Sequence, residues 1–466
     1  MKKVVKMPIK FLKKRAPFIV WFQQKTTQKE LINMKTTNNF LHNLQVKLWQ
    51  KTDEVTESLS AKEKKFTRDL IKGIIQSKSC ILRQIAQSQK EDISLEDTCK
   101  RYRRHLSKPE ISSTLSENHL RQHCRKINQD SLIIFDPSDI RKNYAQKMEG
   151  LSVVHDGSTG KSCKGYNILD AINVNETDDG LRISPLVSEI HTNKEDAGVM
   201  KQSFFDRIND IQVYSNNRGT FIMDRGYDDR KVFSYLTEHE APFIIRAKRG
   251  RMLYYQGEEL SFIEAAKKAK LKYRYQSGKA HLKAGMIRVG IRKGPHPKKN
   301  PEIIYLDLVV GRYVSKDTEG IECDKGYFYL YCNFPSHLQE SSDQQKIERA
   351  LSAYRIRWKI EEVHRHIKQD YKWEDMRVMK LERLKALNSL LLIAVSFMYS
   401  LDQYKYQLAH LYSNLMLDRK NHFGKFKKFI YYRLALVASE IFKGFKRYSK
   451  LPYRGIATGE VQLSWF

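Results

Sequence analysis

The chain has 466 residues, with 84 Lys and Arg against 53 Asp and Glu, and its formal net charge is +31. Such an excess of cations argues against an acidic or neutral metabolic role and indicates a polyanionic partner, although charge alone does not separate DNA from RNA or an anionic membrane. The length allows two or three domains, and a hydrophobic content of 41% excludes global disorder.

No thiol site or membrane segment is expected. The six cysteines include no C-x2-C pair, which predicts reduced thiols rather than a zinc site or a disulfide framework. Residues 1–22 alternate basic and apolar residues without a continuous apolar core, so we expect no signal peptide. The most apolar run, from Leu384 to Leu401, is interrupted by Lys385 and Asn388, which favours a buried helix. We therefore expect a cytoplasmic protein.

Residues 1–128 carry helical patterns and no strong strand. Within 79–105, a short helix, a turn and a second helix are compatible with a helix-turn-helix, which would offer Arg101, Arg103 and Arg104 to phosphates. Short basic helix pairs are common and most bind no nucleic acid, so this motif is weak on its own. The expected helices lie near 36–51, 60–76, 79–89, 94–106 and 115–127.

From Leu132 onward the pattern changes to short β-rich runs, with helical stretches at about 196–212 and 228–240. The order of three strands, helix, strand, helix and strand predicts an α/β fold, with a ribonuclease-H-like mixed sheet and helices on its faces. The expected strands are LIIFD, GYNILDAINV, RISPLV, TFIMD and PFIIR.

A second β-rich segment follows at about 250–332, in which KGPHPKKNP predicts a loop. Its expected strands are YRYQS, IRVGIRK, IIYLDLVVGRYV and GYFYLYCNF. A helix at about 340–370 comes next, followed by an all-helical basic region. The tail 418–450 mixes cations with aromatics, and we weigh equally its binding to DNA or a protein partner and its packing as an amphipathic helix. The expected domains are 1–128, 129–380 and 381–466.

Two aspartates directly follow apolar strand-like runs. Asp136 follows 132–135, and Asp224 follows 221–223. An ionised carboxylate after a buried strand is costly unless something pairs with it, and a metal ion would do so. Hard Mg2+ prefers oxygen ligands, and two ions about 3.5–4 Å apart can activate a water and stabilise a leaving oxygen. Because an Asp at a strand end also commonly starts a turn, neither residue is decisive alone.

Other acids compete for the same role. Asp139 lies three residues after Asp136, and Asp156 lies in VVHDGSTGK, where residues 155–158 read as a loop. We favour Asp136 because a strong strand leads directly into it. The GSTGK run lacks the GxxxxGK[ST] spacing, so it does not predict a P-loop.

One face of the expected helix at 340–370 carries an aromatic hydroxyl, two cations and one carboxylate with the spacing Y-x2-R-x3-E-x6-K. These residues are Tyr354, Arg357, Glu361 and Lys368. At about 100° per residue they fall within an arc of roughly 60°. The opposite side carries the apolar residues Ile356, Ile360, Val363 and Ile367. A charged helix face is ordinarily just solvated, but a lone acid among cations suits a site for a metal ion and phosphates.

Three neighbours of this face are set aside. Glu362 lies about 100° from Glu361 in helical phase, off the face. His364 and His366 form an H-x-H pair, but no other ligands lie near them in sequence, so we expect them to be polar helix residues.

The Y-R-E-K spacing resembles the signature of the insertion-sequence-four family of bacterial cut-and-paste transposases. SLIIFDPSDI resembles the family's first acidic motif, with Ser138 as the hydroxyl residue two positions on, and IMDRGYDD resembles its second, D-R-G-[FY]. The resemblance covers about 130–380. It implies that Asp136, Asp224 and Glu361 form a DDE triad.

The resemblance also assigns DNA contacts. It implies that Tyr354, Arg357 and Lys368 contact phosphates near the cleaved end, with Arg225 assisting. It further implies a helical DNA-end-binding domain and a β-strand insertion before the last catalytic helix. The implied cofactor is Mg2+ (or Mn2+), held by the three acids.

The activity implied is cleavage of double-stranded DNA at terminal inverted repeats, a hairpin intermediate and insertion into target DNA. It would be carried out by a homodimer in a synaptic complex within the bacterial nucleoid. Two alternatives remain. A degenerate transposase would keep DNA affinity without catalysis, and a basic RNA-processing enzyme could use the same fold.

Overall fold

The structure is a computed structural model, and it describes residues 34–156, 160–195, 198–277, 280–293, 302–316, 322–409 and 430–444. Two compact units are distinguished, Met1–Lys51 and Thr52–Phe466. The described residues of the first unit belong to helix α2 (Met34–Val55). Everything below concerns the second unit. The expected three-domain division stays a prediction.

Four further helices come before the sheet, as the helical pattern predicted: α3 (Ala61–Ser77), α4 (Leu82–Gln89), α5 (Leu95–Leu106) and α6 (Pro109–Cys124). Local sequence fixes their starts. The Ser60 side chain caps α3 in a reciprocal capping box with Glu63, and Ser94 caps α5. The last helix was expected to begin at 115, but it begins at Pro109, since proline lacks the N–H that the first turn leaves unpaired.

The expected pair of helices, α4 and α5, is present, but two of its three arginines already have acidic partners. Arg101 Nη2 lies 2.5 Å from Glu91 Oε2, and Arg103 Nη1 lies 3.4 Å from Glu96 Oε1. Arg104 is exposed. DNA contact by this helix pair stays a prediction.

A mixed sheet follows, and twelve of its strands lie in the described residues. Its central part runs in the order β4-β3-β1-β5-β6. The neighbours β4, β3 and β1 are antiparallel, whereas β5 and β6 run parallel to β1. The order and directions confirm the expected ribonuclease-H-like α/β core. The strands are β1 (Leu132–Arg141), β3 (Lys161–Thr177), β4 (Gly180–His191), β5 (Thr220–Met223) and β6 (Phe243–Arg246).

One strand in this region was not expected. The interpretation of residues 155–158 as a loop is wrong for the first two, because β2 (Ser152–Asp156) pairs with the start of β3. Val154 is buried in this pair while Val153 is exposed, which is the alternation of an edge strand. The remaining residues of that stretch lie outside the described residues.

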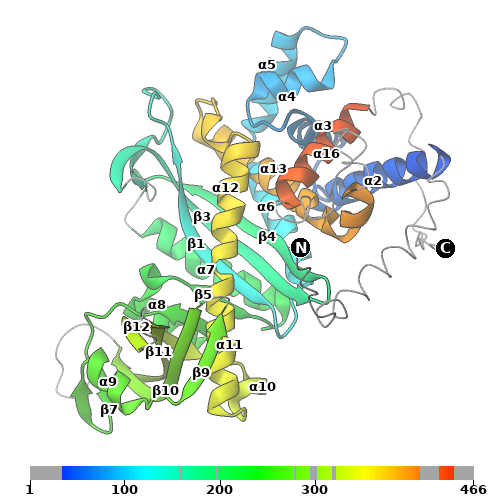
Figure 1. Ribbon diagram of the computed structural model, residues 1–466. Helices are drawn as coiled ribbons and strands as arrows, with labels where there is room; N and C mark the ends of the chain where they lie inside the picture. The colour runs from blue at the N-terminus through cyan, green and yellow to red at the C-terminus, as the bar shows by residue number, and fades with distance from the viewer. Residues whose placement is uncertain are drawn as a thin grey trace, which may run out of the picture. The chain divides into compact units, whose positions relative to one another are not determined.

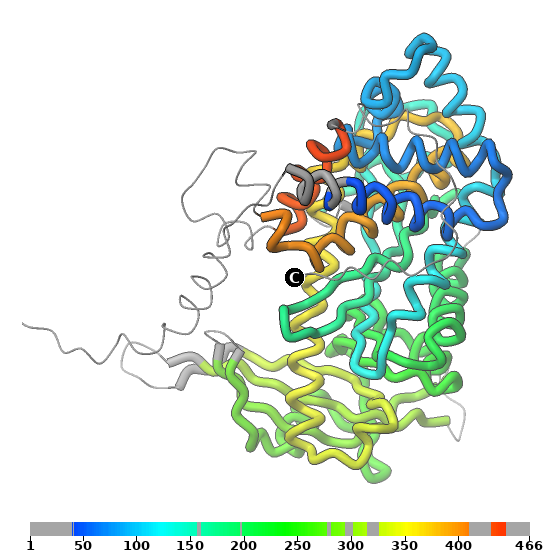
Figure 2. The backbone as a smooth tube through the Cα atoms, turned by 90° about the vertical axis from the view of Figure 1, so that its right-hand side faces the viewer, coloured from blue at the N-terminus to red at the C-terminus, as the bar shows by residue number. Residues whose placement is uncertain are grey.

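The second β-rich segment continues the same sheet. Strand β12 pairs with β6 in antiparallel fashion, and β11 and β10 follow outward. The green and yellow-green strands of this segment lie together at the lower end of the tube in Figure 2. The long strands were all expected, whereas the short β7, β8 and α9 were not. The KGPHPKKNP loop lies almost wholly outside the described residues. The elements are β7 (Leu253–Tyr255), β8 (Glu258–Leu260), α9 (Phe262–Lys268), β9 (Tyr273–Ser277), β10 (Ala280–Arg292), β11 (Ile303–Lys316) and β12 (Glu322–Asn333).

The expected helix at 340–370 is two helices, α11 (Asp343–Ile356) and α12 (Trp358–Asp370), which follow one another along the sheet (Figure 1). The break falls on Arg357, whose backbone is still helical at φ −48° and ψ −35°. There the hydrogen bonds shorten to i→i−3, from Arg357 N to Tyr354 O and from Ile360 N to Arg357 O, each 3.2 Å. A tightened turn of this kind carries no Gly or Pro signal.

Helices cover both faces of the sheet. Ile133 and Phe135 of β1 face a core with α7 (Val199–Ser215) and α8 (Arg230–Glu238). The other face carries α12 and α13 (Leu381–Ser400). One helical stretch, Leu381–Ala409, is apolar enough to span a membrane, but 89% of its most apolar window is buried inside the protein. The predicted buried helix is confirmed, and the described residues give no sign of a membrane protein.

The expected basic tail is described only at α16 (Ile430–Gly444). This helix lies beside α3 and α13, with its apolar side chains buried (Figure 1). Ser439 Oγ donates to Gln76 O at 2.7 Å, and Gln76 Nε2 donates to Phe442 O. For these residues the structure supports the packing interpretation. The rest of the tail lies outside the described residues.

Candidate functional site

Asp136 and Asp224 occupy adjacent positions on neighbouring strands. Phe135 pairs with Met223 in the parallel β1–β5 register, and each Asp is the next residue. The expectation that Asp136 ends its strand is wrong, because β1 continues to Arg141 along its antiparallel partner β3. What ends at this point is the parallel partner. Asp136 therefore lies where β1 loses β5 as a neighbour.

The residues after Asp224 fix the direction of its side chain. Asp224 Oδ1 accepts a 2.7 Å hydrogen bond from Gly226 N, and it caps the short 3-10 turn η2 (Arg225–Tyr227). A Cβ at position 226 would lie 2.8 Å from this same oxygen, too close for any other residue to fit without a shift. This close approach explains locally why the third residue of the D-R-G sequence is a glycine. Arg225 points away from packed structure and is exposed.

Glu361 reaches the same place from α12, through Arg357. The Arg357 guanidinium lies between two acids, with Nη1 3.3 Å from Asp136 Oδ1 and Nη2 2.6 Å from Glu361 Oε1. The three side chains are only 15%, 14% and 29% exposed, in the order Arg357, Asp136 and Glu361. The structure thus places Arg357 between Asp136 and Glu361, while Asp224 follows the strand beside that of Asp136.

The surroundings of Asp136 disfavour its ionised form. Burial raises the pKa of Asp136 to about 6, even though Arg357 and His364 oppose the shift, and the nearby charges of Asp224 and Glu361 raise it further. A carboxylate in this position gains more from an added cation than an exposed one would. This is the electrostatic setting of a cation site.

Two tyrosines border the acids. Burial raises the pKa of Tyr354, whose hydroxyl lies within hydrogen-bond reach of Arg246 and feels the charge of Arg357. Burial raises the pKa of Tyr227, and the charges of Asp136 and Asp224 raise it further. Arg246 was missed in the sequence, because no local spacing marks it and only the end of β6 brings it here. Tyr227 lies at the aromatic position of the D-R-G-[FY] motif, but the sequence assigned it no role.

Lys368 belongs to a second charged cluster, one to two turns further along α12. Its Nζ lies 3.4 Å from Glu374 Oε1 and 3.7 Å from Asp139 Oδ2. Arg141 holds Glu374 from the other side, through Nε–Oε1 at 2.9 Å and Nη2–Oε2 at 3.0 Å. Asp139, the expected competitor of Asp136, thus pairs with this lysine.

Of the three residues that the sequence analysis set aside, Glu362 lies away from the acids, whereas the two histidines are buried. Glu362 pairs with Lys359 at 2.8 Å, away from the acids, as its helical phase predicted. His364 and His366 are buried rather than simply polar, and each pairs with an aspartate. His364 Nε2 lies 2.9 Å from Asp170 Oδ2, beside the candidate site.

The donor chemistry fits a hard divalent cation, since carboxylate oxygens are the ligands that Mg2+ and Mn2+ prefer. In the part of the chain that the structure describes, however, no three His, Cys, Asp or Glu side chains converge closely enough to hold one ion. Arg357 lies between two of the acids and accounts for part of their separation. Binding of an ion by all three acids would require Arg357 to move.

Residues 127–397 match the family model described as "Transposase DDE domain". The match covers more than half of the chain and includes all the strands and helices that build the site. Comparison with curated proteins finds no match.

Proposed function

The chain belongs to the DDE transposase family, and we propose on this premise that it cuts the ends of an insertion sequence and joins them to target DNA. Members of this family act on DNA and generally use divalent metals such as Mg2+. The observation that supports the proposal is that Asp136, Asp224 and Glu361 come from three separate elements, with Arg357 between two of them and the charges of Asp224 and Glu361 acting on Asp136.

We assign the three acids as ligands of Mg2+ or Mn2+. When bound, such an ion supplies charge stabilisation for the attacking and leaving oxygens of phosphoryl transfer. The protein's own groups would position these ligands. The backbone N–H of Gly226 directs the Asp224 carboxylate, and Glu361 lies one turn after the break between α11 and α12 at Arg357. Rigid placement of this kind supplies much of the rate enhancement in phosphoryl chemistry.

Arg357, Lys368 and Tyr354 are assigned to DNA phosphates, with Arg225 assisting. Arg357 and Lys368 are each held by carboxylates in this structure. A phosphate offers a guanidinium or ammonium the same charge-assisted hydrogen bonds. Binding of DNA would thus exchange protein acids for phosphates. The exchange releases the acids beside Arg357 at the moment when the substrate arrives.

The finer assignments follow the Y-R-E-K spacing. It supports membership of the insertion-sequence-four family, with cleavage at terminal inverted repeats, hairpin ends and a homodimeric synaptic complex. The N-terminal helices would bind the DNA ends. The +31 charge supports extensive contact with DNA.

One observation favours a second candidate, a degenerate transposase that only binds DNA. Arg357 lies where a cation shared by Asp136 and Glu361 would sit. In a binding protein it could remain there permanently.

Cleavage of the element's own end DNA by the purified full chain tests the proposal. We expect cutting at the end of the repeat with Mg2+ and none with EDTA. Binding without cutting, with both Mg2+ and Mn2+, would favour the DNA-binding candidate. Preference for an RNA duplex over the DNA end would favour the RNA-processing alternative.

A further inference from the structure

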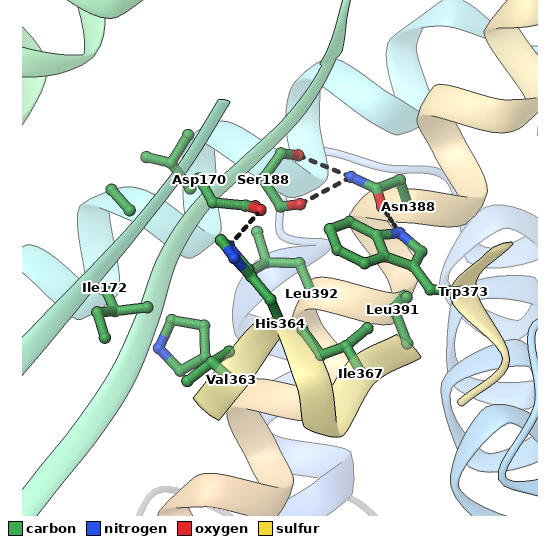
Figure 3. A pocket seen from close by; sticks show the side chains of 13 residues that line it. Asp170, Ile172, Ser188, Val363, His364, Ile367, Trp373, Asn388, Leu391 and Leu392 are labelled. Carbon is green, nitrogen blue, oxygen red and sulfur yellow. Dashed lines mark hydrogen bonds and ion pairs between the residues drawn. The ribbon is translucent and has the colours of Figure 1, made fainter. Parts of the chain in front are cut away.

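His364 of α12 and Asp170 of β3 form a buried pair at the edge of the candidate site. His364 Nε2 lies 2.9 Å from Asp170 Oδ2, and the two residues are only 9% and 6% exposed. Figure 3 shows the imidazole reaching from the helix to the strand. A buried carboxylate without a partner is costly, so this contact stabilises the position of both elements.

The pair connects the elements that carry two of the three acids. Asp170 lies directly opposite Asp136 in the antiparallel β1–β3 register, so the two side chains are neighbours on the same face of the sheet. His364 lies three residues after Glu361, on nearly the same side of α12. The contact therefore ties the Glu361 helix to the strand beside Asp136.

The surroundings make this tie rigid. Beside it lies a cavity of about 20 Å³, large enough for about one water molecule. Behind the cavity, Trp373 Nε1 donates to Asn388 Oδ1 at 2.7 Å, and Asn388 Nδ2 donates to Ser188 O at 2.9 Å (Figure 3). Removing one partner of such a buried pair is costly, because the other polar group is left buried and uncompensated. The apolar side chains of the lining include Val363, Ile367, Leu391 and Leu392.

We propose that His364 and Asp170 are positioning residues that hold Glu361 at a fixed distance from Asp136 and thereby set the affinity of the site for its divalent ion. This inference rests on the proposed function. Groups that orient metal ligands typically change metal affinity by about 10- to 100-fold when they are removed.

The chain provides a matched control in His366. It is also a buried histidine of α12, and its Nε2 lies 3.4 Å from Asp370 Oδ2, but its Nδ1 lies 3.3 Å from the Tyr399 hydroxyl on the side of α13. It therefore has the same chemistry as His364 without the connection to β3. Loss of either histidine should lower the melting temperature.

The experiment measures the Mn2+ dissociation constant of the full chain on end DNA by electron paramagnetic resonance, together with the melting temperature. We expect His364→Gln and Asp170→Asn each to weaken Mn2+ binding by about 10- to 100-fold. The double variant should be little worse than either single variant, because both remove one contact. His366→Gln should leave Mn2+ affinity unchanged.

Two results would overturn the inference. One is a lower melting temperature with unchanged Mn2+ affinity in His364→Gln. The other is loss of Mn2+ binding in Asp170→Asn alone, which would make Asp170 a ligand. If the wild-type protein bound no Mn2+ at all, the proposed function itself would fail.

Discussion

Arg357 Nη2 lies 2.6 Å from Glu361 Oε1, one helical turn along the chain, and the same guanidinium reaches Asp136. An arginine therefore neutralises two of the acids that we assign to a metal ion. In the proposed site, a cation and Arg357 would compete for the same carboxylates, whereas DNA phosphates would compete with those carboxylates for Arg357. We therefore propose that metal binding and DNA binding are coupled, and such coupling is reciprocal.

The first prediction concerns this coupling. A charge-assisted hydrogen bond of a partly buried group is worth about 1.5–3 kcal/mol, so Arg357→Ala should tighten Mn2+ binding by the DNA-free protein by about tenfold or more. End DNA should tighten Mn2+ binding in the wild type but not in this variant. Titration calorimetry measures both effects. Lys359→Ala, which removes a pair away from the site, is the control. Equal Mn2+ affinity in the wild type and Arg357→Ala would refute the coupling.

A second prediction separates two neighbouring glutamates. Glu361→Gln should abolish cleavage of end DNA while leaving end binding largely intact, because it removes a carboxylate ligand and keeps the volume of the side chain. Glu362→Gln should cleave like the wild type, since Glu362 pairs with Lys359 instead. A cleavage assay and a gel-shift assay on the same duplex measure both properties. Equal loss of cleavage in the two variants would mean that the wrong glutamate is assigned.

The third prediction concerns stability against pH. The pKa of Asp136 is about 6 in the folded protein, against an ordinary value of 3.8. Below about pH 4 this carboxyl is largely protonated in both the folded and the unfolded state, so its ionisation contributes little to the free energy of unfolding. As pH rises from about 4 to 6, the unfolded chain ionises first, so the folded state loses stability. In metal-free protein, Asp136→Asn should therefore raise the free energy of unfolding above pH 6, by about 1–3 kcal/mol.

Denaturant unfolding at pH 4 and pH 7.5 checks this sign. The gain should disappear at pH 4, and Mg2+ should reduce it at pH 7.5, because the ion stabilises the wild-type carboxylate. Glu176→Gln, at an exposed position of β3, should change little at either pH. Destabilisation by Asp136→Asn at pH 7.5 would show that Arg357 already compensates this charge in full.

The three acids could be proposed from the sequence alone. Asp136 and Asp224 each follow a strong apolar run, and helical spacing sets Glu361 among cations. Asp170 and Arg246, and the pairing of His364, were not accessible. Asp170 meets Asp136 through strand register, and His364 meets Asp170 because α12 passes over the sheet. Pairing partners leave no trace in the local pattern of either strand.

The errors have a similar origin. The β-rich segment at 250–332 was recognised, but its continuation of the central sheet through β6 and β12 depends on strand partners 84 to 90 residues apart in the chain, from Leu330–Arg246 to Asn333–Phe243. The break at Arg357 was missed because helical φ and ψ persist through it. Strand β2 was missed because a His-Asp-Gly sequence is typical of a turn.

A fourth prediction follows from the charge. With a net charge of +31, the affinity for end DNA should fall steeply as salt rises, by about a thousandfold between about 50 and 200 mM if six or more phosphates are contacted. Fluorescence anisotropy over this range measures the slope. A flat plot of log K against log salt concentration would contradict extensive phosphate contact.

The most direct test of the central claim is to cut the polypeptide itself with a bound metal. Fe2+ in the Mg2+ site, with ascorbate and peroxide, releases hydroxyl radicals that cleave the nearest backbone. With end DNA bound, we predict cuts near Asp136, Asp224 and Glu361 that excess Mg2+ suppresses and that Ala substitution of any one acid weakens at all three places. Cuts elsewhere, or cuts unaffected by these substitutions, would contradict a shared metal site.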